Sequence, residues 1–173
     1  MSPLHPSTSP DPRRQGHRGL ARGFTLIEMV VVVMVVAILA SAAMPLAALQ
    51  KRRSQEADLR LALRTVRGAL DAYKKAWDEG HIEHHADESG YPHSLEELVN
   101  GVPDVTSAKG GRLYFLRRLP RDPFADASVP AASTWGLRSY ASPPDAPAPG
   151  ADVFDVYSQH RGVGLDGTPY RDW

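Results

Sequence analysis

The stretch Arg22-Gly23-Phe24-Thr25-Leu26-Ile27-Glu28 opens an almost wholly apolar run that continues to Leu49. The polar residues inside this run are Thr25, Glu28 and Ser41, and its helix breaker is Pro45. About 20 consecutive apolar residues are enough to cross the hydrocarbon core of a bilayer. Residues 24–49 are therefore predicted to form a transmembrane helix.

The segment before this run, residues 1–23, is polar and rich in Pro, Ser and Arg. It holds four arginines and one aspartate, a formal charge of +3, so the remainder of the neutral chain carries −3. A basic segment before an apolar run is typical of a targeting signal, and its composition predicts disorder. Its charge favours a cytoplasmic N-terminus, although residues 51–53 make the other flank basic too.

Beyond the apolar run, large apolar residues recur at spacings of 4, 3, 4, 3 and 4, which is one stripe of an amphipathic helix. The stripe consists of Leu59, Leu63, Val66, Leu70, Tyr73 and Trp77. Residues 50–79 are therefore predicted to continue the first helix until it stops near Gly80, giving one helix about 84 Å long. Glu56 and Arg60 are expected to form an ion pair on its solvent-facing side.

Residues 80–173 are expected to form a small exported domain whose short elements are separated by Gly- and Pro-rich turns. A capping-box pattern predicts a short helix over residues 94–100, and runs of strand-forming residues predict strands over 134–141 and 152–158. Two or three short strands are not stable by themselves. The apolar stripe of the long helix is therefore expected to form the second layer of the core. The predicted fold is α+β. Further core candidates are Trp135, Tyr140, Phe154 and Tyr157.

Three residues at the start of the apolar run suggest processing followed by assembly. Gly23 permits the extended backbone that a protease grips, and a cut after it would make Phe24 the new N-terminal residue. A carboxylate at the start of a membrane segment, as at Glu28, is unfavourable unless it finds a partner. The α-ammonium group created at Phe24, on the same helix or on a neighbouring subunit, is such a partner.

This stretch resembles the class III signal of type IV prepilins and of type II secretion pseudopilins. In that family a prepilin peptidase cuts after the glycine and N-methylates the new N-terminal residue, usually phenylalanine. The resemblance implies cleavage between Gly23 and Phe24 and methylation of Phe24. The family's characteristic glutamate falls on Glu28, and a proline common in its membrane helix falls on Pro45, so both residues are expected to serve filament assembly.

The remainder of the chain resembles the secretion branch of this family. Residues 91–98, 119–124 and 154–158 follow the order of segments in major-pseudopilin-like proteins, and residues 165–170 with Trp173 are similar to the end of pseudopilin-like paralogues. Type IV pilins often close a C-terminal loop with a disulfide. This chain contains no cysteine, which favours a pilin-like α+β fold of the secretion type over an adhesive pilin.

Calcium is the one cofactor that the resemblance raises, because major pseudopilins bind it in a C-terminal loop. The candidate ligands here are Asp155, Ser158, Asp166 and Asp172. Calcium takes about six to eight oxygen ligands, usually with several carboxylates close together. Gln159-His160-Arg161 stands where an acidic, glycine-rich run is expected and adds a cation, which disfavours the site.

A second possible metal cluster consists of His81, Glu83, His84 and His85. Adjacent positions 84 and 85 diverge on any regular element and no fourth ligand is placed, so a solvated loop is favoured. The sequence shows no Ser-His-Asp set, phosphate-binding loop or paired carboxylates. An enzyme is therefore not expected.

Two other interpretations of the N-terminus remain open. A secretory signal peptide would use the small-residue site Ala40-Ser41-Ala42, and an ordinary membrane anchor would carry the motif by accident. The position of Glu28 and the continuation of the apolar run beyond Ala42 oppose the signal peptide.

The predicted function is that of a structural subunit of the type II secretion pseudopilus. The implied partners are prepilin peptidase, copies of the chain, other pseudopilins and an inner-membrane assembly platform, with no nucleic acid expected. The implied location is the inner membrane, crossed once, with a cytoplasmic N-terminus and a periplasmic domain. The alternatives are a minor type IV pilin or DNA-uptake pseudopilin and, in another class, a membrane-anchored binding domain that uses the histidine loop.

Overall fold

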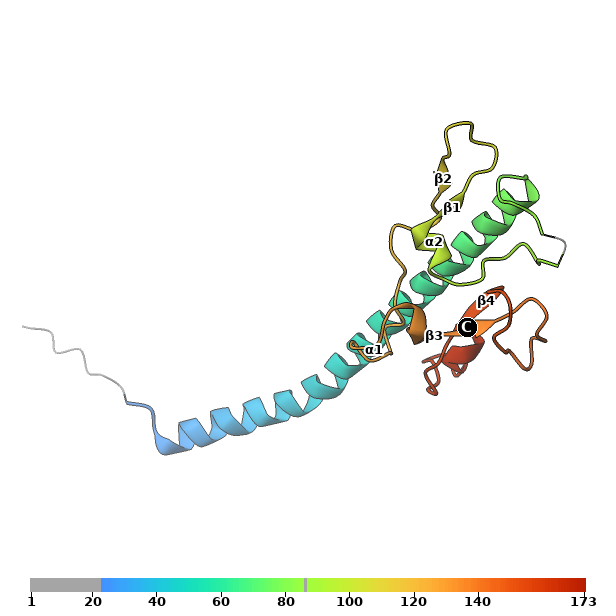
Figure 1. The fold of residues 1–173 in the computed structure, drawn as a ribbon. Coiled ribbons are helices and arrows are strands. Elements are labelled where there is room, and N and C mark those ends of the chain that lie inside the picture. Colours follow the sequence, from blue (N-terminus) through green and yellow to red (C-terminus); the bar gives the residue numbers. More distant parts are fainter. Residues whose placement is uncertain (1–22, 86) are drawn as a thin grey trace, which may run out of the picture. The chain divides into compact units, whose positions relative to one another are not determined.

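The computed structural model describes residues 23–85 and 87–173, so the expected leader lies outside the described residues apart from Gly23. The elements in chain order are α1 (Leu26–Asp78), α2 (Glu97–Asn100), β1 (Val102–Pro103), β2 (Arg112–Leu113), the 3₁₀ turn η1 (Ala132–Thr134), β3 (Trp135–Arg138), β4 (Asp155–Ser158) and the 3₁₀ turn η2 (Tyr170–Asp172). The expected α+β fold is confirmed, with one long N-terminal helix and small antiparallel sheets (Figure 1). Backbone contacts divide the described chain into two units, one that ends at Met44 and a second that covers Pro45–Trp173.

Helix α1 is slightly shorter than the predicted 24–79, and local hydrogen bonds account for both ends. At its start, the N–H of Glu28 donates to Thr25 Oγ1 at 3.3 Å, so Thr25 caps the helix and leaves Phe24 outside it. At its end, Gly80 has φ +80°, and the N–H groups of Gly80 and His81 donate to the carbonyls of Trp77 and Ala76. This pair of bonds is a Schellman motif, which needs a residue at positive φ and explains the stop at glycine.

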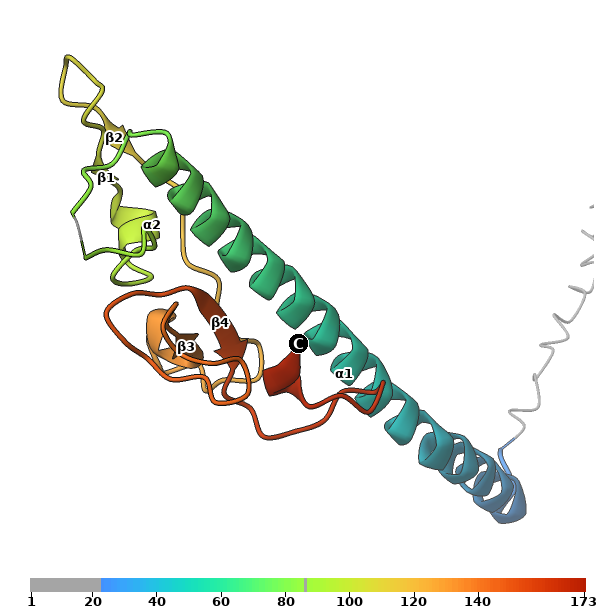
Figure 2. The same cartoon turned by 90° about the vertical axis from the view of Figure 1, so that its right-hand side faces the viewer.

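Within the second unit, the short elements lie along the C-terminal half of α1 (Figure 2). Strands β3 and β4 and the turn η2 lie beside the middle of the helix, while α2, β1 and β2 lie nearer its C-terminal end (Figures 1 and 2). The helix therefore forms one layer of this unit, as the weakness of isolated short strands requires.

The strands are shorter than predicted and form two separate sheets of two strands each. Strand β3 pairs antiparallel with β4, with Trp135 opposite Ser158 and Arg138 opposite Asp155. The prediction of strands over 134–141 and 152–158 was too long because the chain leaves the sheet at both ends: the N–H of Ser139 donates to Ala148, and that of Val153 donates to Pro92. The hairpin of β1 and β2 was not predicted, since each strand has only two residues.

Helix α2 is also shorter than the predicted 94–100. Residues 94–96 form a turn, and the capping box is not realised, because Glu97 accepts a hydrogen bond from the N–H of His93 instead of reaching back to Ser94. The helix ends at Gly101, which has φ +73°. Its single turn still buries Leu98 completely against the core.

The predicted stripe of α1 forms the centre of the core. Its buried members are Leu59, Leu63, Val66, Leu70 and Tyr73, with Trp77 partly buried beside them. Strands β3 and β4, the loop before β4 and the C-terminal segment add Trp135, Val153, Val156 and Tyr170. Phe154 and Tyr157 are half-buried, but Tyr140 is 62% exposed and was wrongly expected in the core, because it lies beyond the end of β3.

Two leucines of α1 provide a matched test of this core. Leu59 is fully buried, whereas Leu61 is 57% exposed. We expect Leu59→Ala to lower the free energy of unfolding by about 2–4 kcal/mol, since it removes packed atoms and leaves a cavity. Leu61→Ala should change the free energy by less than about 0.5 kcal/mol. Urea unfolding of the full chain in detergent, followed by tryptophan fluorescence, measures both; equal effects would contradict the placement of the stripe.

Candidate functional site

The N-terminal end of the described chain presents the predicted cleavage residues to solvent. Gly23, Phe24 and Thr25 precede α1 in non-helical conformation, and the Phe24 side chain is 72% exposed. A peptide bond outside a helix and free of packing is accessible to a protease. The Thr25 hydroxyl, which sequence reasoning did not single out, fixes the first helical turn directly after it. The T-x-x-E spacing of Thr25 and Glu28 was the available signal for this cap.

Glu28 lies in the first turn of α1, and its side chain is exposed. Its carboxylate makes no hydrogen bond or ion pair with any residue that the structure describes. Ser41 differs, because its hydroxyl donates to the carbonyl of Ile38 at 2.7 Å within the same helix. Of these two side chains, the Ser41 hydroxyl is satisfied within its own helix, and the Glu28 carboxylate has no partner among the described residues.

The helix around these residues carries an exposed apolar surface. Large side chains from Leu26 to Leu39 are exposed on every side, at values between 45% and 83%. Among the described residues, one helix is long enough and apolar enough to cross a membrane, and it is α1. The backbone of Pro45 is helical, and its side chain lies outside the described part of the structure. Its role in assembly therefore stays a prediction.

The second unit contains a buried carboxylate at Glu56, where a solvent-facing ion pair with Arg60 was predicted. That prediction was wrong, since Glu56 is 4% exposed and faces the C-terminal segment. Its Oε1 accepts a hydrogen bond from the N–H of Leu165 and another from the hydroxyl of Tyr170, both at 2.9 Å. The guanidinium of Arg52 lies 3.4 Å from the same oxygen. Burial of the carboxylate is thus offset by three donors.

The two side chains beside Glu56, Tyr170 and Arg52, both have raised pKa values. Tyr170 is 2% exposed, and this burial raises the pKa of its phenol. The hydrogen bond that Arg52 donates to Tyr170 is the largest contribution raising the pKa of the guanidinium. Arg52 also donates to the carbonyl of Val163. Carboxylate, phenol and guanidinium therefore hold residues 163–170 against α1.

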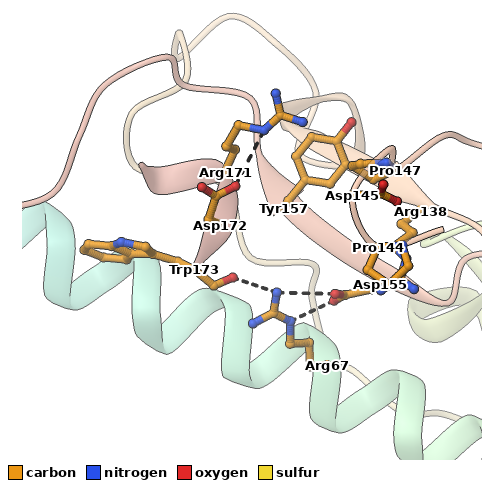
Figure 3. A pocket seen from close by; sticks show the side chains of 10 residues that line it. All are labelled: Arg67, Arg138, Pro144, Asp145, Pro147, Asp155, Tyr157, Arg171, Asp172 and Trp173. Atoms are coloured by element: carbon orange, nitrogen blue, oxygen red, sulfur yellow. Dashed lines mark hydrogen bonds and ion pairs between the residues drawn. The ribbon is translucent and has the colours of Figure 1, made fainter. Parts of the chain in front are cut away.

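Two further arginines of α1 reach the C-terminal segment. Arg60 pairs with Asp166 at 2.9 Å and lies with its guanidinium carbon 3.9 Å from the centre of the Trp173 ring. Arg67 contacts Asp155 at 2.7 Å and donates to the main-chain oxygen of Trp173 at 2.8 Å (Figure 3). The spacing from Arg52 through Glu56 and Arg60 to Arg67 is 4, 4 and 7 residues, which places the four side chains on one side of the helix. We call these four residues the helix clamp.

The structure does not gather the four calcium candidates into one site. Asp155 pairs with Arg67, Asp166 with Arg60, and Asp172 lies 3.7 Å from Arg171. Ser158 is fully buried and donates its hydroxyl to Asp122, itself 2% exposed. Each carboxylate candidate thus has a guanidinium beside it, and the serine serves a buried link between β4 and the 122–124 turn. This donor set does not fit a calcium ion.

The histidine loop is likewise dispersed. His81 Nδ1 lies 3.2 Å from Asp104 Oδ1 and 3.0 Å from the hydroxyl of Thr106. The Thr106 hydroxyl also donates a hydrogen bond to Asp104, and this bond is the main cause of the lowered pKa of that carboxyl. His84 stacks on Trp77 with ring centroids 3.9 Å apart. Within residues 23–85 and 87–173, His, Asp and Glu side chains form no group of three that could hold a metal ion.

Comparisons with known proteins agree with the N-terminal geometry. Residues 18–44 match the family described as the prokaryotic N-terminal methylation motif. The chain is also 32% identical over 107 residues to the type II secretion system core protein G of Klebsiella pneumoniae, covering 60% of this chain and 69% of that protein. The chain belongs to the type IV pilin and type II secretion pseudopilin family. No solved structure matches it.

Membership of the pseudopilin family accounts for the apolar helix but not for the helix clamp, which sequence reasoning missed. Arg52 was counted only as a basic flank of the membrane segment, and Glu56 as a surface charge. A signal was present, because Glu56 comes three residues before the buried Leu59 and so shares its face of α1. The partners of both residues lie more than 100 positions later in the chain, and helix periodicity does not reveal them.

Glu56 provides the test of this arrangement in the pseudopilin fold. Glu56→Ala should lower the free energy of unfolding by about 2–4 kcal/mol, because it leaves a buried phenol and a main-chain N–H without their acceptor. Asp58→Ala is the matched control, since Asp58 is an exposed acid two residues away. Hydrogen exchange of the Leu165 amide in the full chain should accelerate in the first variant and not in the second. Unchanged protection at Leu165 would contradict the observed bond.

Proposed function

We propose that this chain is a structural pseudopilin of the type II secretion system, close to the major pseudopilin or a paralogue of it, and not an enzyme. The similarity to core protein G of Klebsiella pneumoniae supports the secretion branch. The observation that carries the proposal is an apolar helix, exposed on all sides, that begins directly after a methylation motif. Such a helix suits lipid before assembly and packing against other helices after it.

The first step of the proposed mechanism is processing at the N-terminus. Prepilin peptidase removes residues 1–23 on the cytoplasmic side and methylates Phe24. The non-helical, exposed Gly23-Phe24 bond supports this step, because a protease needs an extended substrate. The Thr25 cap keeps the helix from extending into the bond. The apolar part of α1 then anchors the subunit in the inner membrane, with the domain of residues 80–173 in the periplasm.

The second step is assembly with copies of the chain and other pseudopilins on an inner-membrane platform. The Glu28 carboxylate, which has no partner among the described residues, pairs with the N-terminal amine of Phe24 of a neighbouring subunit. Opposite charges that enter an apolar bundle together compensate one another, and an unpaired charge there is strongly unfavourable. The pair sets the axial register of the filament. Pro45 sits in the helical segment that packs in the filament core.

Mass spectrometry of the mature protein tests the processing step. The full chain is produced in a host that carries prepilin peptidase and, as a control, in one that lacks it. The expected product begins at Phe24 and carries one methyl group on its amine, and it is absent from the control host. A product cut after Ala42, or an uncut chain in both hosts, would show that the segment is a signal peptide or a plain anchor.

A variant of Glu28 tests the assembly step separately. Glu28→Gln keeps the size of the side chain but removes its charge, so processing should continue while filament formation falls at least about tenfold, the change expected when a pairing worth about 1.4 kcal/mol or more is lost. Asp58→Asn is the matched control, because it removes the charge of an exposed acid. Glu56→Gln is unsuitable as a control because Glu56 holds the domain together. Electron microscopy and shearing assays count the filaments. Normal assembly of Glu28→Gln would rule out the pairing.

A further inference from the structure

The C-terminal segment after β4 has little regular structure of its own. Residues 159–173 contain the turn η2 and one isolated bridge between Val163 and Pro169. A segment with so little regular secondary structure is ordered more firmly when contacts with the rest of the domain hold it. The resemblance to major pseudopilins raised calcium as a source of such contacts. In this chain, side chains of α1 contact the segment directly.

Arg67 joins strand β4, which precedes this segment, to the segment's last residue. Its Nε and Nη2 contact the two carboxylate oxygens of Asp155 at 2.7 and 3.5 Å. Its Nη2 also donates to the main-chain oxygen of Trp173 at 2.8 Å (Figure 3). The same nitrogen donates to the carbonyl of Val156 at 3.2 Å. One guanidinium therefore joins oxygens from β4 and from the last residue. A planar fork with five donors is well suited to this task.

The carboxylate of Asp155 has little capacity left for a metal ion. Besides the contacts of Arg67, its Oδ1 accepts the N–H of Val156 at 2.7 Å. A divalent cation bound there would also lie close to a fixed guanidinium. Two positive charges held this close repel each other strongly where the surroundings are only partly solvated. Arg67 thus places a fixed positive charge against the carboxylate that a calcium ion would need.

The other members of the helix clamp tie the rest of the segment to α1. Arg52 holds the carbonyl of Val163, Glu56 holds the N–H of Leu165, and Arg60 holds the side chain of Asp166. These are a main-chain acceptor, a main-chain donor and a side-chain acceptor from three residues within the stretch 163–166. The clamp therefore satisfies polar groups of both signs, which a metal ion, binding only acceptors, does not do.

We propose that the helix clamp of Arg52, Glu56, Arg60 and Arg67 orders the C-terminal segment in place of calcium, so that this domain folds and keeps its stability without the ion. An arginine is charged at every physiological pH and, being part of the polypeptide, cannot dissociate as a metal ion can. The stability of the exported domain is then independent of free calcium in the compartment where it folds. This inference concerns the domain alone and does not rest on the proposed pairing of Glu28.

Thermal unfolding of the full chain in detergent, with calcium in excess or with a chelator, tests the proposal. The parent chain should unfold at the same temperature in both buffers, because a ligand that binds the folded state raises the midpoint and an ion that does not bind leaves it unchanged. Calorimetric titration with calcium should give no saturable heat. A midpoint that rises with calcium and falls again with chelator would overturn the proposal.

Substitution of the clamp tests its contribution directly. Arg67→Met should lower the midpoint by roughly 3–8 °C in both buffers and should accelerate amide exchange in residues 159–173. Arg64→Met is the matched control, since Arg64 is an exposed arginine of the same helix that makes no ion pair with a described residue. If Arg67→Met does not fold, Arg67→Lys keeps the charge without the fork and should show a smaller loss. Equal midpoints for the Arg67 and Arg64 variants would overturn the proposal.

Discussion

The two small sheets depend on one apolar stripe of α1 for their second layer. Each sheet has two strands of at most four residues, too little to bury a core between themselves. Leu59, Val66 and Leu70 are at most 1% exposed and lie at the centre of the cluster that also contains Trp135 and Val156. The same helix continues toward its N-terminus as a segment that is apolar and exposed on all sides. A single element therefore supplies both a domain core and a surface suited to lipid or to other helices.

Charged residues on α1 extend this dependence from the core to the end of the chain. The buried carboxylate of Glu56 is surrounded by a phenol, a main-chain N–H and the guanidinium of Arg52. Arg60 and Arg67 continue the series along the same side of the helix. Because a buried ion without partners is strongly unfavourable, these contacts specify how the C-terminal segment lies as well as holding it there.

The two ends of the chain handle polar groups in opposite ways. In the second unit the side chains of Glu56, Arg67, Asp122 and Ser158 find partners within the domain. At the start of the apolar part of α1, the Thr25 hydroxyl accepts a hydrogen bond from a helix N–H, and further along the Ser41 hydroxyl donates to a helix carbonyl. The carboxylate of Glu28 has no partner among the described residues. The carboxylate of Glu28 is therefore the group on which the proposed assembly step depends.

The sequence by itself determined the processing motif, the apolar run, the stripe of α1 and the α+β class, because each depends on residues close together in the chain. Spacing was enough to place Leu59 in the core and Gly80 at the helix end. Only the tertiary structure decided the roles of Glu56, Arg60 and Arg67, since their partners are 88 to 114 positions away and periodicity carries no information about them. It also decided that Tyr140 is exposed and that the strands are short, because the chain leaves the sheet to bond with Ala148 and Pro92. Local patterns thus specified the helix, and long-range hydrogen bonds and charge pairs specified what the helix holds.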